Sequence, residues 1–232
     1  MLKRIFDLLV SGTVLVVLSL PLAVIIAVLK LTGEREAFYF QDRVGYLGKI
    51  IKVTKFVTMV KDSPNMGTQD ITLRNDPRVL PVGKFLRKTK LNEVPQFWDV
   101  FVGKLSLVGW RPLMPKGFAD YPETVQKKIV HVKPGITGLG SIVFRDEEAI
   151  IAKAQVLGCD LRTCYRDDIM PFKGALECWY VDNRSLWVDV KILVATALAV
   201  LMPNWKGYKG WFLNLPNPST QLVQEHFGMK QN

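Results

Sequence analysis

Residues 8–29, LLVSGTVLVVLSLPLAVIIAVL, form a run of 22 residues without a charged side chain. An α-helix of that length is about 33 Å long, and the hydrocarbon core of a bilayer is about 30 Å thick. A secretory signal is the competing interpretation, but its apolar region usually has only about 7–15 residues. The run also lacks a small-x-small cleavage site before Lys30. We therefore predict a membrane helix here.

A break is expected in the middle of this run, at Ser19 and Pro21. Proline removes one backbone donor and clashes with the preceding turn, so it kinks a helix. Basic residues flank both ends of the run, namely Lys3, Arg4, Lys30 and Arg35. Because such charges favour the cytoplasmic side, neither direction of threading is preferred. Two topologies stay open on these residues: a spanning helix that tolerates the proline, and a re-entrant helix-break-helix.

The 232 residues suffice for one domain with a sizeable core but not for two large ones. A hydrophobic content of 49% argues against disorder. The 31 Lys and Arg against 21 Asp and Glu give a net charge of +10, which predicts anionic partners: nucleic acid, an anionic membrane or phosphorylated substrates. Three cysteines without paired spacing and two distant histidines argue against a disulfide framework, a zinc site or a histidine triad. A carboxylate is the expected catalytic group.

Beyond residue 36 the pattern is that of a helix-rich α/β body. Short strands are predicted at 38–41 and 49–56, with Gly45 and Gly48 in the turn between them. Capping and breaking residues predict a helix from Asp146 to Gly158 and another from Ser185 to Leu201. The step Lys133-Pro134-Gly135 fits a type II turn.

The C-terminal end combines apolar, aromatic and basic residues. The uncharged stretch from Ile192 to Met202 has 11 residues and is too short to span a membrane. Beyond it, four aromatic residues are interleaved with two lysines: Trp205, Tyr208, Trp211, Phe212, Lys206 and Lys209. This composition is typical of an interfacial amphipathic contact with lipid, and a buried helix with an exposed tail is the alternative.

The chemistry is expected between residues 40 and 116, where 14 Lys and Arg stand against 6 Asp and Glu, a net charge of +8. Asn92 is a good N-cap, so a helix is predicted to begin there and to face three cations, Arg87, Lys88 and Lys90. Such a helix start binds phosphate, and Glu93 within it could hold a divalent ion that bridges a pyrophosphate. On these residues alone, the favoured interpretation is that Glu93 only complements the helix dipole and that the cations form a solvated face.

A second phosphate-binding candidate follows in the loop Gly103–Leu113. Arg111 lies there between Gly109 and Pro112, after an apolar run. A guanidinium group can clamp a phosphate with two parallel hydrogen bonds. Arg111 is therefore expected to contact an anionic substrate.

Motifs from Lys3 to about Met202 carry a family resemblance. They are Lys3-Arg4 with Phe6-Asp7, Arg43-Val44-Gly45 with Gly48-Lys49, Lys55-Phe56, Asn75-Asp76-Pro77-Arg78-Val79, Phe85-Leu86-Arg87-Lys88-Thr89, Glu93-Val94-Pro95-Gln96, Ser106-Leu107-Val108-Gly109 with Arg111-Pro112, Pro134-Gly135-Ile136-Thr137-Gly138, and Tyr180-Val181 with Asn183, Ser185, Leu186, Trp187, Asp189 and Lys191. With these motifs the chain resembles the bacterial sugar transferase family, the monotopic phosphoglycosyl transferases.

The resemblance implies a fold, a reaction and a location. It implies a re-entrant membrane helix at 1–36, broken near Ser19 and Pro21. It also implies a catalytic domain at 37–203 and a C-terminal tail at 204–232. The catalytic domain is expected on the cytoplasmic face of the bacterial inner membrane. The implied reaction moves a sugar 1-phosphate from a UDP-sugar to polyprenyl (undecaprenyl) phosphate and releases UMP. The resemblance further implies Mg²⁺, held by Glu93, and phosphate binding by Arg87, Lys88, Arg111 and Lys55. Membrane lipids are expected partners, and a homo-oligomer stays open.

One departure from the family pattern affects the catalytic dyad. The family uses an Asp-Glu dyad whose aspartate attacks the sugar-linked phosphate, and here the dyad reads Asn92-Glu93. A neutral amide is a poor nucleophile. Three accounts follow: Glu93 is the nucleophile, Glu93 holds magnesium while the lipid phosphate attacks directly, or transfer activity is lost.

The favoured hypothesis is a transferase that initiates a lipid-linked glycan, such as a capsule, exopolysaccharide, O-antigen or glycoprotein glycan. The alternative is a catalytically silent membrane scaffold that binds nucleotide sugar, as Asn92 suggests. A nucleic-acid-binding protein is disfavoured, because the positive charge accompanies a long apolar segment and no recognisable binding motif.

Overall fold

The computed structural model describes residues 1–66, 76–156, 158, 160–202, 205, 207–218, 220 and 223. Within them the chain forms two compact units. The first unit consists of Met1–Arg43 and Ile50–Leu107, and the second of Val44–Lys49 and Val108–Asn232. Helices predominate and the strands form two small sheets, β1-β2 and β3-β4, which confirms the prediction of a helix-rich α/β fold.

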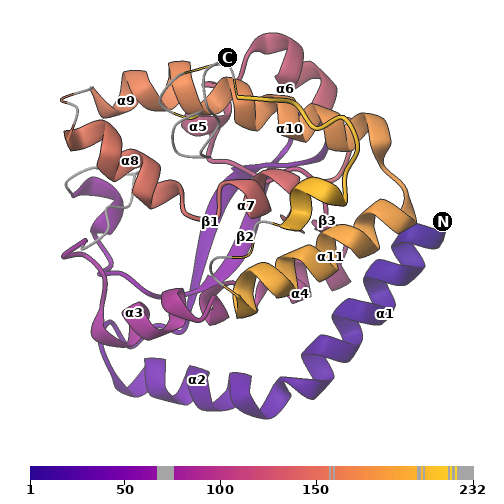
Figure 1. Ribbon diagram of the computed structural model, residues 1–232. Helices are drawn as coiled ribbons and strands as arrows, with labels where there is room; N and C mark the ends of the chain where they lie inside the picture. The colour runs from indigo at the N-terminus through magenta and orange to yellow at the C-terminus, as the bar shows by residue number, and fades with distance from the viewer. Residues whose placement is uncertain are drawn as a thin grey trace. The chain divides into compact units, whose positions relative to one another are not determined.

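The first unit begins with a bent helix pair. The helices α1 (Leu2–Val17) and α2 (Ser19–Leu31) meet at Leu18 with a bend of 62° (Figure 1). Pro21 lies in the first turn of α2, where its missing N–H costs little. The predicted break is therefore confirmed. Among the described residues no single helix is long and apolar enough to cross a membrane, although α1 and α2 together satisfy the length and composition of a span.

The remaining elements of the first unit follow this pair. The strands β1 and β2 form the predicted hairpin, and its turn contains Gly48 at a φ of 73°. Arg78 forms a buried ion pair with Asp76 at 2.6 Å and donates to the carbonyls of Ser63 and Met66, while Asn75 of the same motif lies outside the described residues. The elements are β1 (Phe38–Val44), β2 (Ile50–Phe56), η2 (Ser63–Asn65), α3 (Pro81–Lys88), η3 (Leu91–Glu93), α4 (Gln96–Phe101) and β3 (Ser106–Val108), which reaches the boundary of the unit.

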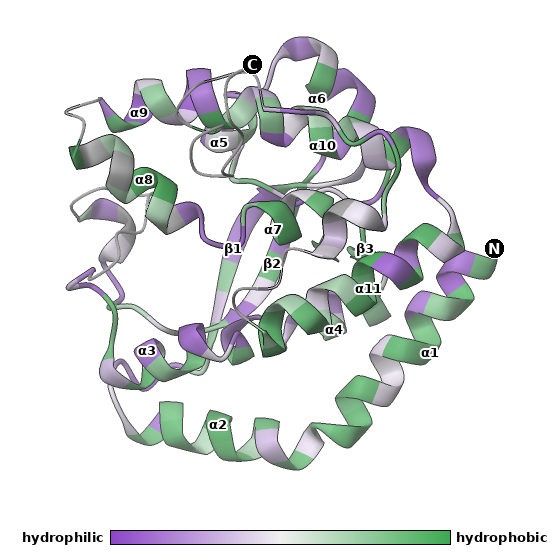
Figure 2. Cartoon of the chain, in the orientation of Figure 1, coloured by the Kyte–Doolittle hydropathy of each residue, from purple (hydrophilic) through white to green (hydrophobic). Residues whose placement is uncertain are grey.

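Both ends of the bent pair are fastened to this first unit. Near the start of α1, Arg4 donates to the carbonyls of Val100 and Phe101 at 2.7 Å each, at the end of α4. Asp7 is buried and accepts from the Ser106 hydroxyl at 2.8 Å and from the Leu107 N–H at 3.2 Å. At the other end, Leu29 of α2 is buried in a core cluster with Ala37, Phe56 and Leu86. The opposite side of α2 exposes Leu20, Val24, Val28 and Leu31, and Figure 2 shows this helix as almost entirely hydrophobic.

The second unit is built on helices around a buried α10. Its core includes Ile129, Leu139, Ile150, Leu176 and Ile192. The Tyr180 hydroxyl on α10 lies 3.1 Å from Val108 O and 2.7 Å from Asp189 Oδ1 on α11. Tyr180 and Asp189 of the Tyr180–Lys191 motif therefore join α10 to α11. The elements are η1 (Tyr46–Gly48), α5 (Pro115–Phe118), α6 (Glu123–Ile129), β4 (Gly135–Thr137), α7 (Leu139–Val143), α8 (Glu147–Val156), α9 (Leu161–Cys164), η4 (Tyr165–Ile169), α10 (Met170–Asn183), α11 (Leu186–Leu201) and η5 (Gly207–Gly210).

Two sequence predictions hold in this unit and two are wrong. The helix ended by Gly158 is α8, and Ser185 caps α11 by accepting from the Val188 N–H at 3.2 Å. The type II turn at Gly135 is wrong: this glycine is part of β4, and its backbone approaches Gly109 so closely that a Cβ would overlap it. The aromatic tail is not an exposed lipid contact throughout, because Tyr208 and Phe212 are buried and Phe212 packs on Trp179; Lys206 lies outside the described residues.

Candidate active site

The predicted catalytic pair lies in a tight turn between two helices. After α3 the chain reverses through Lys90, which has a left-handed φ of 60°, and then forms the short 3-10 turn η3. The prediction that Asn92 caps a helix is wrong, because α4 begins only at Gln96 and has six residues. Between η3 and α4 the backbone forms hydrogen bonds of the 3-10 type; for example, the Phe97 N–H donates to Val94 O. Pro95 immediately precedes α4.

A carboxylate and an ammonium group meet in this turn. Lys55 on β2 donates to Glu93 Oε1 at 3.1 Å, and their side chains are 17% and 20% exposed. The pair joins residues 38 positions apart in the sequence. Because it is largely withdrawn from water, its electrostatic attraction is stronger than that of a surface pair. The structure thus brings together two of the residues predicted for the site.

Asn92 lies beside this pair with an unsatisfied oxygen. Its side chain is buried, at 9% exposure, and its Oδ1 makes no hydrogen bond within the part of the chain that the structure describes. A buried acceptor without a partner costs about 1–3 kcal/mol, so such an atom usually serves a ligand, an ion or an ordered water. Its position next to Glu93 makes Asn92 a candidate ligand group rather than a nucleophile.

The remaining predicted cations divide between the two units. Arg87 and Lys88 occupy the last turn of α3, in the same unit as Glu93, where Arg87 is half-buried and Lys88 is exposed. Cations in this place also stabilise the helix by complementing its dipole. Arg111 belongs to the second unit, where its backbone N–H donates to Glu177 Oε1 at 3.3 Å.

A buried aspartate fixes the strand that carries Lys55, and sequence reasoning missed it. Asp99 on α4 accepts from the Thr54 N–H at 2.7 Å, from the Thr54 hydroxyl at 3.1 Å and from Lys104 at 3.3 Å. Its side chain is fully buried. The available signal was a single acidic residue in the otherwise apolar stretch Phe97–Val102. Asp99 thereby sets the position of β2 against α4, next to the Lys55–Glu93 pair.

Comparison with known proteins places this geometry in a family. The model of the family described as bacterial sugar transferase matches residues 1–203. The chain belongs to the bacterial sugar transferase family. The resemblance seen in the motifs is therefore confirmed, and the family match covers both Glu93 and Arg111.

Individual relatives of this family member carry informative names. An undecaprenyl-phosphate galactose phosphotransferase of Salmonella typhimurium is 33% identical over 86% of this chain and 40% of that protein. A UDP-glucose:undecaprenyl-phosphate glucose-1-phosphate transferase of Klebsiella pneumoniae is 35% identical over 84% of this chain and 39% of that protein. The chain thus spans about 40% of the length of these relatives. An uncharacterised sugar transferase of Bacillus subtilis, EpsL, is 34% identical over 87% of this chain and 88% of its own length.

The residues of the candidate site supply too few oxygen ligands to hold a metal ion without a substrate. In the described parts of the chain, no group of three or more His, Cys, Asp or Glu residues could hold a metal ion. Magnesium, however, is usually bound by one or two carboxylates together with substrate phosphates and water. Glu93 and the unpartnered Oδ1 of Asn92 supply two hard oxygen ligands of that kind. These two oxygens are the groups of this turn that would hold a magnesium ion bound together with a pyrophosphate.

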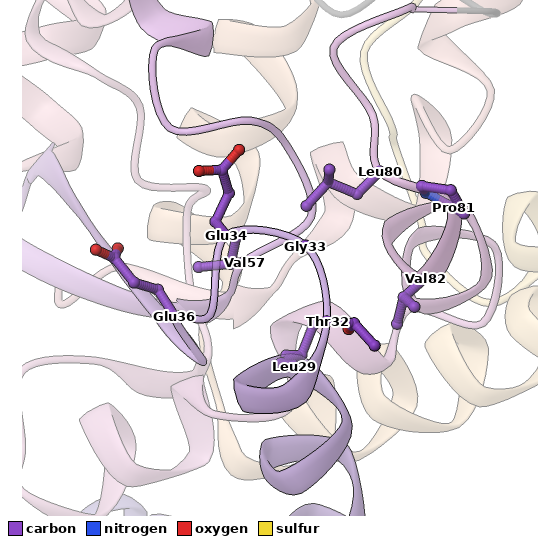
Figure 3. Close-up of a pocket in the computed structure, with 9 residues that line it drawn as sticks. All are labelled: Leu29, Thr32, Gly33, Glu34, Glu36, Val57, Leu80, Pro81 and Val82. Carbon is purple, nitrogen blue, oxygen red and sulfur yellow. The ribbon is translucent and has the colours of Figure 1, made fainter.

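A separate cavity of about 270 Å³ lies in the first unit at the end of α2. Figure 3 shows that its lining comes from the end of α2 and the turn after it, from Val57 and from the start of α3. Most of these side chains are apolar, and none of the residues predicted for the active site lines it. The lining residues are Leu29, Thr32, Gly33, Glu34, Glu36, Val57, Leu80, Pro81 and Val82.

Proposed function

We propose that this family member is a membrane phosphoglycosyl transferase. It moves a sugar 1-phosphate from a UDP-sugar to polyprenyl phosphate, releases UMP and so starts a lipid-linked glycan on the cytoplasmic face of the bacterial inner membrane. The observation that carries this proposal is the Glu93 carboxylate, held by Lys55 in a turn that also bears Asn92 and follows the cations of α3. The names of the relatives support the substrate class.

The proposed reaction is a direct transfer between two substrates. An oxygen of the lipid phosphate attacks the phosphorus that carries the sugar. A new P–O bond forms while the bond from that phosphorus to the bridging oxygen breaks, and UMP leaves with the electron pair. This route needs no enzyme nucleophile at residue 92, where the amide of Asn92 cannot supply one.

The protein residues position and neutralise these phosphates. Lys55 fixes the Glu93 carboxylate through their ion pair, and Arg87 brings positive charge to phosphate oxygens, with Lys88 as a further cation. In the second unit, Arg111 is the group proposed to bind a phosphate oxygen. Glu93 and Asn92 Oδ1 would hold the magnesium ion. When bound, magnesium neutralises the charge that develops on the phosphates and orients them.

The direct route predicts that UMP release requires the lipid. We expect purified protein with magnesium and a suitable UDP-sugar to release UMP only when polyprenyl phosphate is present, and its intact mass to show no phosphosugar adduct. The variant Asn92→Asp restores a nucleophile and should release about one UMP per protein without lipid. A stoichiometric, lipid-independent burst from the unaltered protein would instead make Glu93 the nucleophile. UDP-sugar binding without any turnover would support the silent scaffold.

We further propose that α1 and α2 form a re-entrant segment. A spanning segment must place its two ends about 30 Å apart, on opposite faces of the hydrocarbon. Here Arg4 and Asp7 near one end and Leu29 near the other all contact the same compact unit. A single folded unit cannot lie on both faces at once. The apolar outer side of α2, the exposed Trp98 and Phe101 of α4, and Val102 just after α4 would then face lipid.

The re-entrant topology predicts that both chain ends are on the cytoplasmic face. Tags attached at residue 1 and at residue 232 should both be cleaved by protease added to inside-out vesicles, and both should be protected in right-side-out vesicles. A tagged protein that crosses the membrane once provides the control, because only one of its tags should be cleaved in each preparation. Tags of this protein on opposite faces would contradict the re-entrant topology and favour a spanning helix.

A further inference from the structure

The second unit contains a buried carboxylate that contacts the backbone of Arg111. Glu177 on α10 is fully buried, and its Oε1 accepts from the Arg111 N–H at 3.3 Å. Its Oε2 has no hydrogen bond within the described residues. A carboxylate without solvent requires a reason, because burying it costs free energy unless its surroundings compensate.

One glycine makes room for this carboxylate. A Cβ added at Gly140 would lie 2.5 Å from Glu177 Oε1, whereas a Cβ added at the nearby Gly138 would overlap Gly109 O and only touch Glu177 Oε2, at 3.8 Å. Gly138 immediately precedes α7, and Gly140 lies in the first turn of α7. The backbone at the start of α7 therefore packs directly against Glu177 and restricts its movement, so the carboxylate is a rigid acceptor.

Ionisable groups from several elements surround Glu177. Burial raises its pKa from 4.5 to about 7, and the Arg111 N–H, Lys173 and Arg111 lower it less than burial raises it. Lys173 is itself buried and donates to Glu147 at 2.7 Å. The groups that act on Glu177 or on its neighbours are Lys173 on α10, Arg111 in the loop after β3, Tyr121 after α5, Glu147 on α8, Tyr165 in η4 and Cys178 on α10.

We infer that Glu177 is a positioning residue that holds the Arg111 loop in place through the Arg111 N–H. This inference rests on the proposed function, in which Arg111 binds phosphate. The ionised carboxylate is the stronger acceptor, because a hydrogen bond to a charged oxygen is roughly twice as strong as one to a neutral oxygen. Ionisation of Glu177 therefore strengthens the hold on the loop, and protonation weakens it.

The variant Glu177→Gln tests this inference through pH. Glutamine has nearly the shape of protonated Glu177 but does not ionise. At pH 6, where Glu177 is mostly protonated, kcat/KM for the UDP-sugar should match that of the unaltered protein. At pH 8 it should be about tenfold lower, since only the unaltered protein then has the charged acceptor. The control Asp182→Asn removes an exposed carboxylate from the same helix and should leave the profile unchanged.

A second readout separates the inference from the proposed function. Hydrogen exchange of the peptide 109–114 should be faster in Glu177→Gln than in the unaltered protein at pH 8 and equal at pH 6. If the unaltered protein released no UMP, that result would contradict the proposed function. The hydrogen-exchange comparison does not depend on UMP release and would still test the inference. If Glu177→Gln fails to fold, Glu177→Asp keeps the charge and should keep the pH dependence. Loss by the same factor at every pH, or no change in exchange, would overturn the inference.

Discussion

The variant Glu93→Gln is expected to lower the rate of UMP release about a thousandfold or more. The substitution has two effects. It removes the negative charge of the site, and it leaves Lys55 without the carboxylate that it contacts at 3.1 Å in the unaltered protein. Removing one electrostatic contact from a preorganised site commonly costs a factor of about 10²–10³ in kcat. Initial rates at saturating UDP-sugar and polyprenyl phosphate measure the effect.

A matched carboxylate of the same unit gives the control for this variant. Glu36 is exposed and pairs with Lys61 at 2.9 Å on the surface. Glu36→Gln should keep the rate within about twofold, because exposed ion pairs contribute little. If Glu93→Gln kept the full rate, Glu93 would have no part in the reaction, and the site would have to be sought elsewhere in the chain.

The variant Asp99→Ala is expected to destabilise the first unit by about 3–5 kcal/mol, the range seen when one partner of a buried ionic contact is removed. It leaves the N–H and the hydroxyl of Thr54 buried without their acceptor, and it leaves Lys104 without its charge partner. For a chain of this length such a change lowers Tm by about 10 °C. Thermal unfolding of the detergent-solubilised protein, followed by circular dichroism, measures it.

Two further variants make this second prediction selective. Asp99→Asn retains one acceptor oxygen and should lie between Asp99→Ala and the unaltered protein. Asp62→Ala removes an exposed aspartate whose carboxylate accepts a hydrogen bond from the nearby Asn65 amide at 2.7 Å, and it should shift Tm by less than about 2 °C. A Tm of Asp99→Ala within that same interval would show that this contact does not hold β2 against α4.

Local features of the fold were predictable from the sequence because their causes are local. Pro21 signals the helix break, Gly48 the hairpin turn and Ser185 the start of α11, each through its own backbone or side chain. The family resemblance was likewise readable from contiguous motifs. The positions of Lys55 and Glu93 in one site were inferred only through that resemblance, since no local pattern reveals a contact across 38 residues.

The errors occurred where distant contacts decide the structure. Gly135 was assigned to a turn because it follows Pro134, but it is required by the close approach of Gly109. Asn92 was assigned to a helix cap, but Lys90 and Pro95 on either side confine it to a 3-10 turn. Tyr208 and Phe212 were assigned to lipid because aromatic residues beside lysines are typical of interfaces, but they are buried. Sequence alone does not specify the protein surface that covers them.

The hydrogen bonds of Arg4 and Asp7 have a consequence for how the protein can be handled. The bent helix pair is part of the core of the first unit, because Leu29 packs with Phe56 and Leu86 and Asp7 satisfies Ser106 and Leu107. Deleting residues 1–36 would therefore uncover apolar side chains and leave buried donors without acceptors. The bent helix pair therefore cannot be trimmed away without opening the first unit, so a truncated protein would report on a damaged core and not on the intact fold.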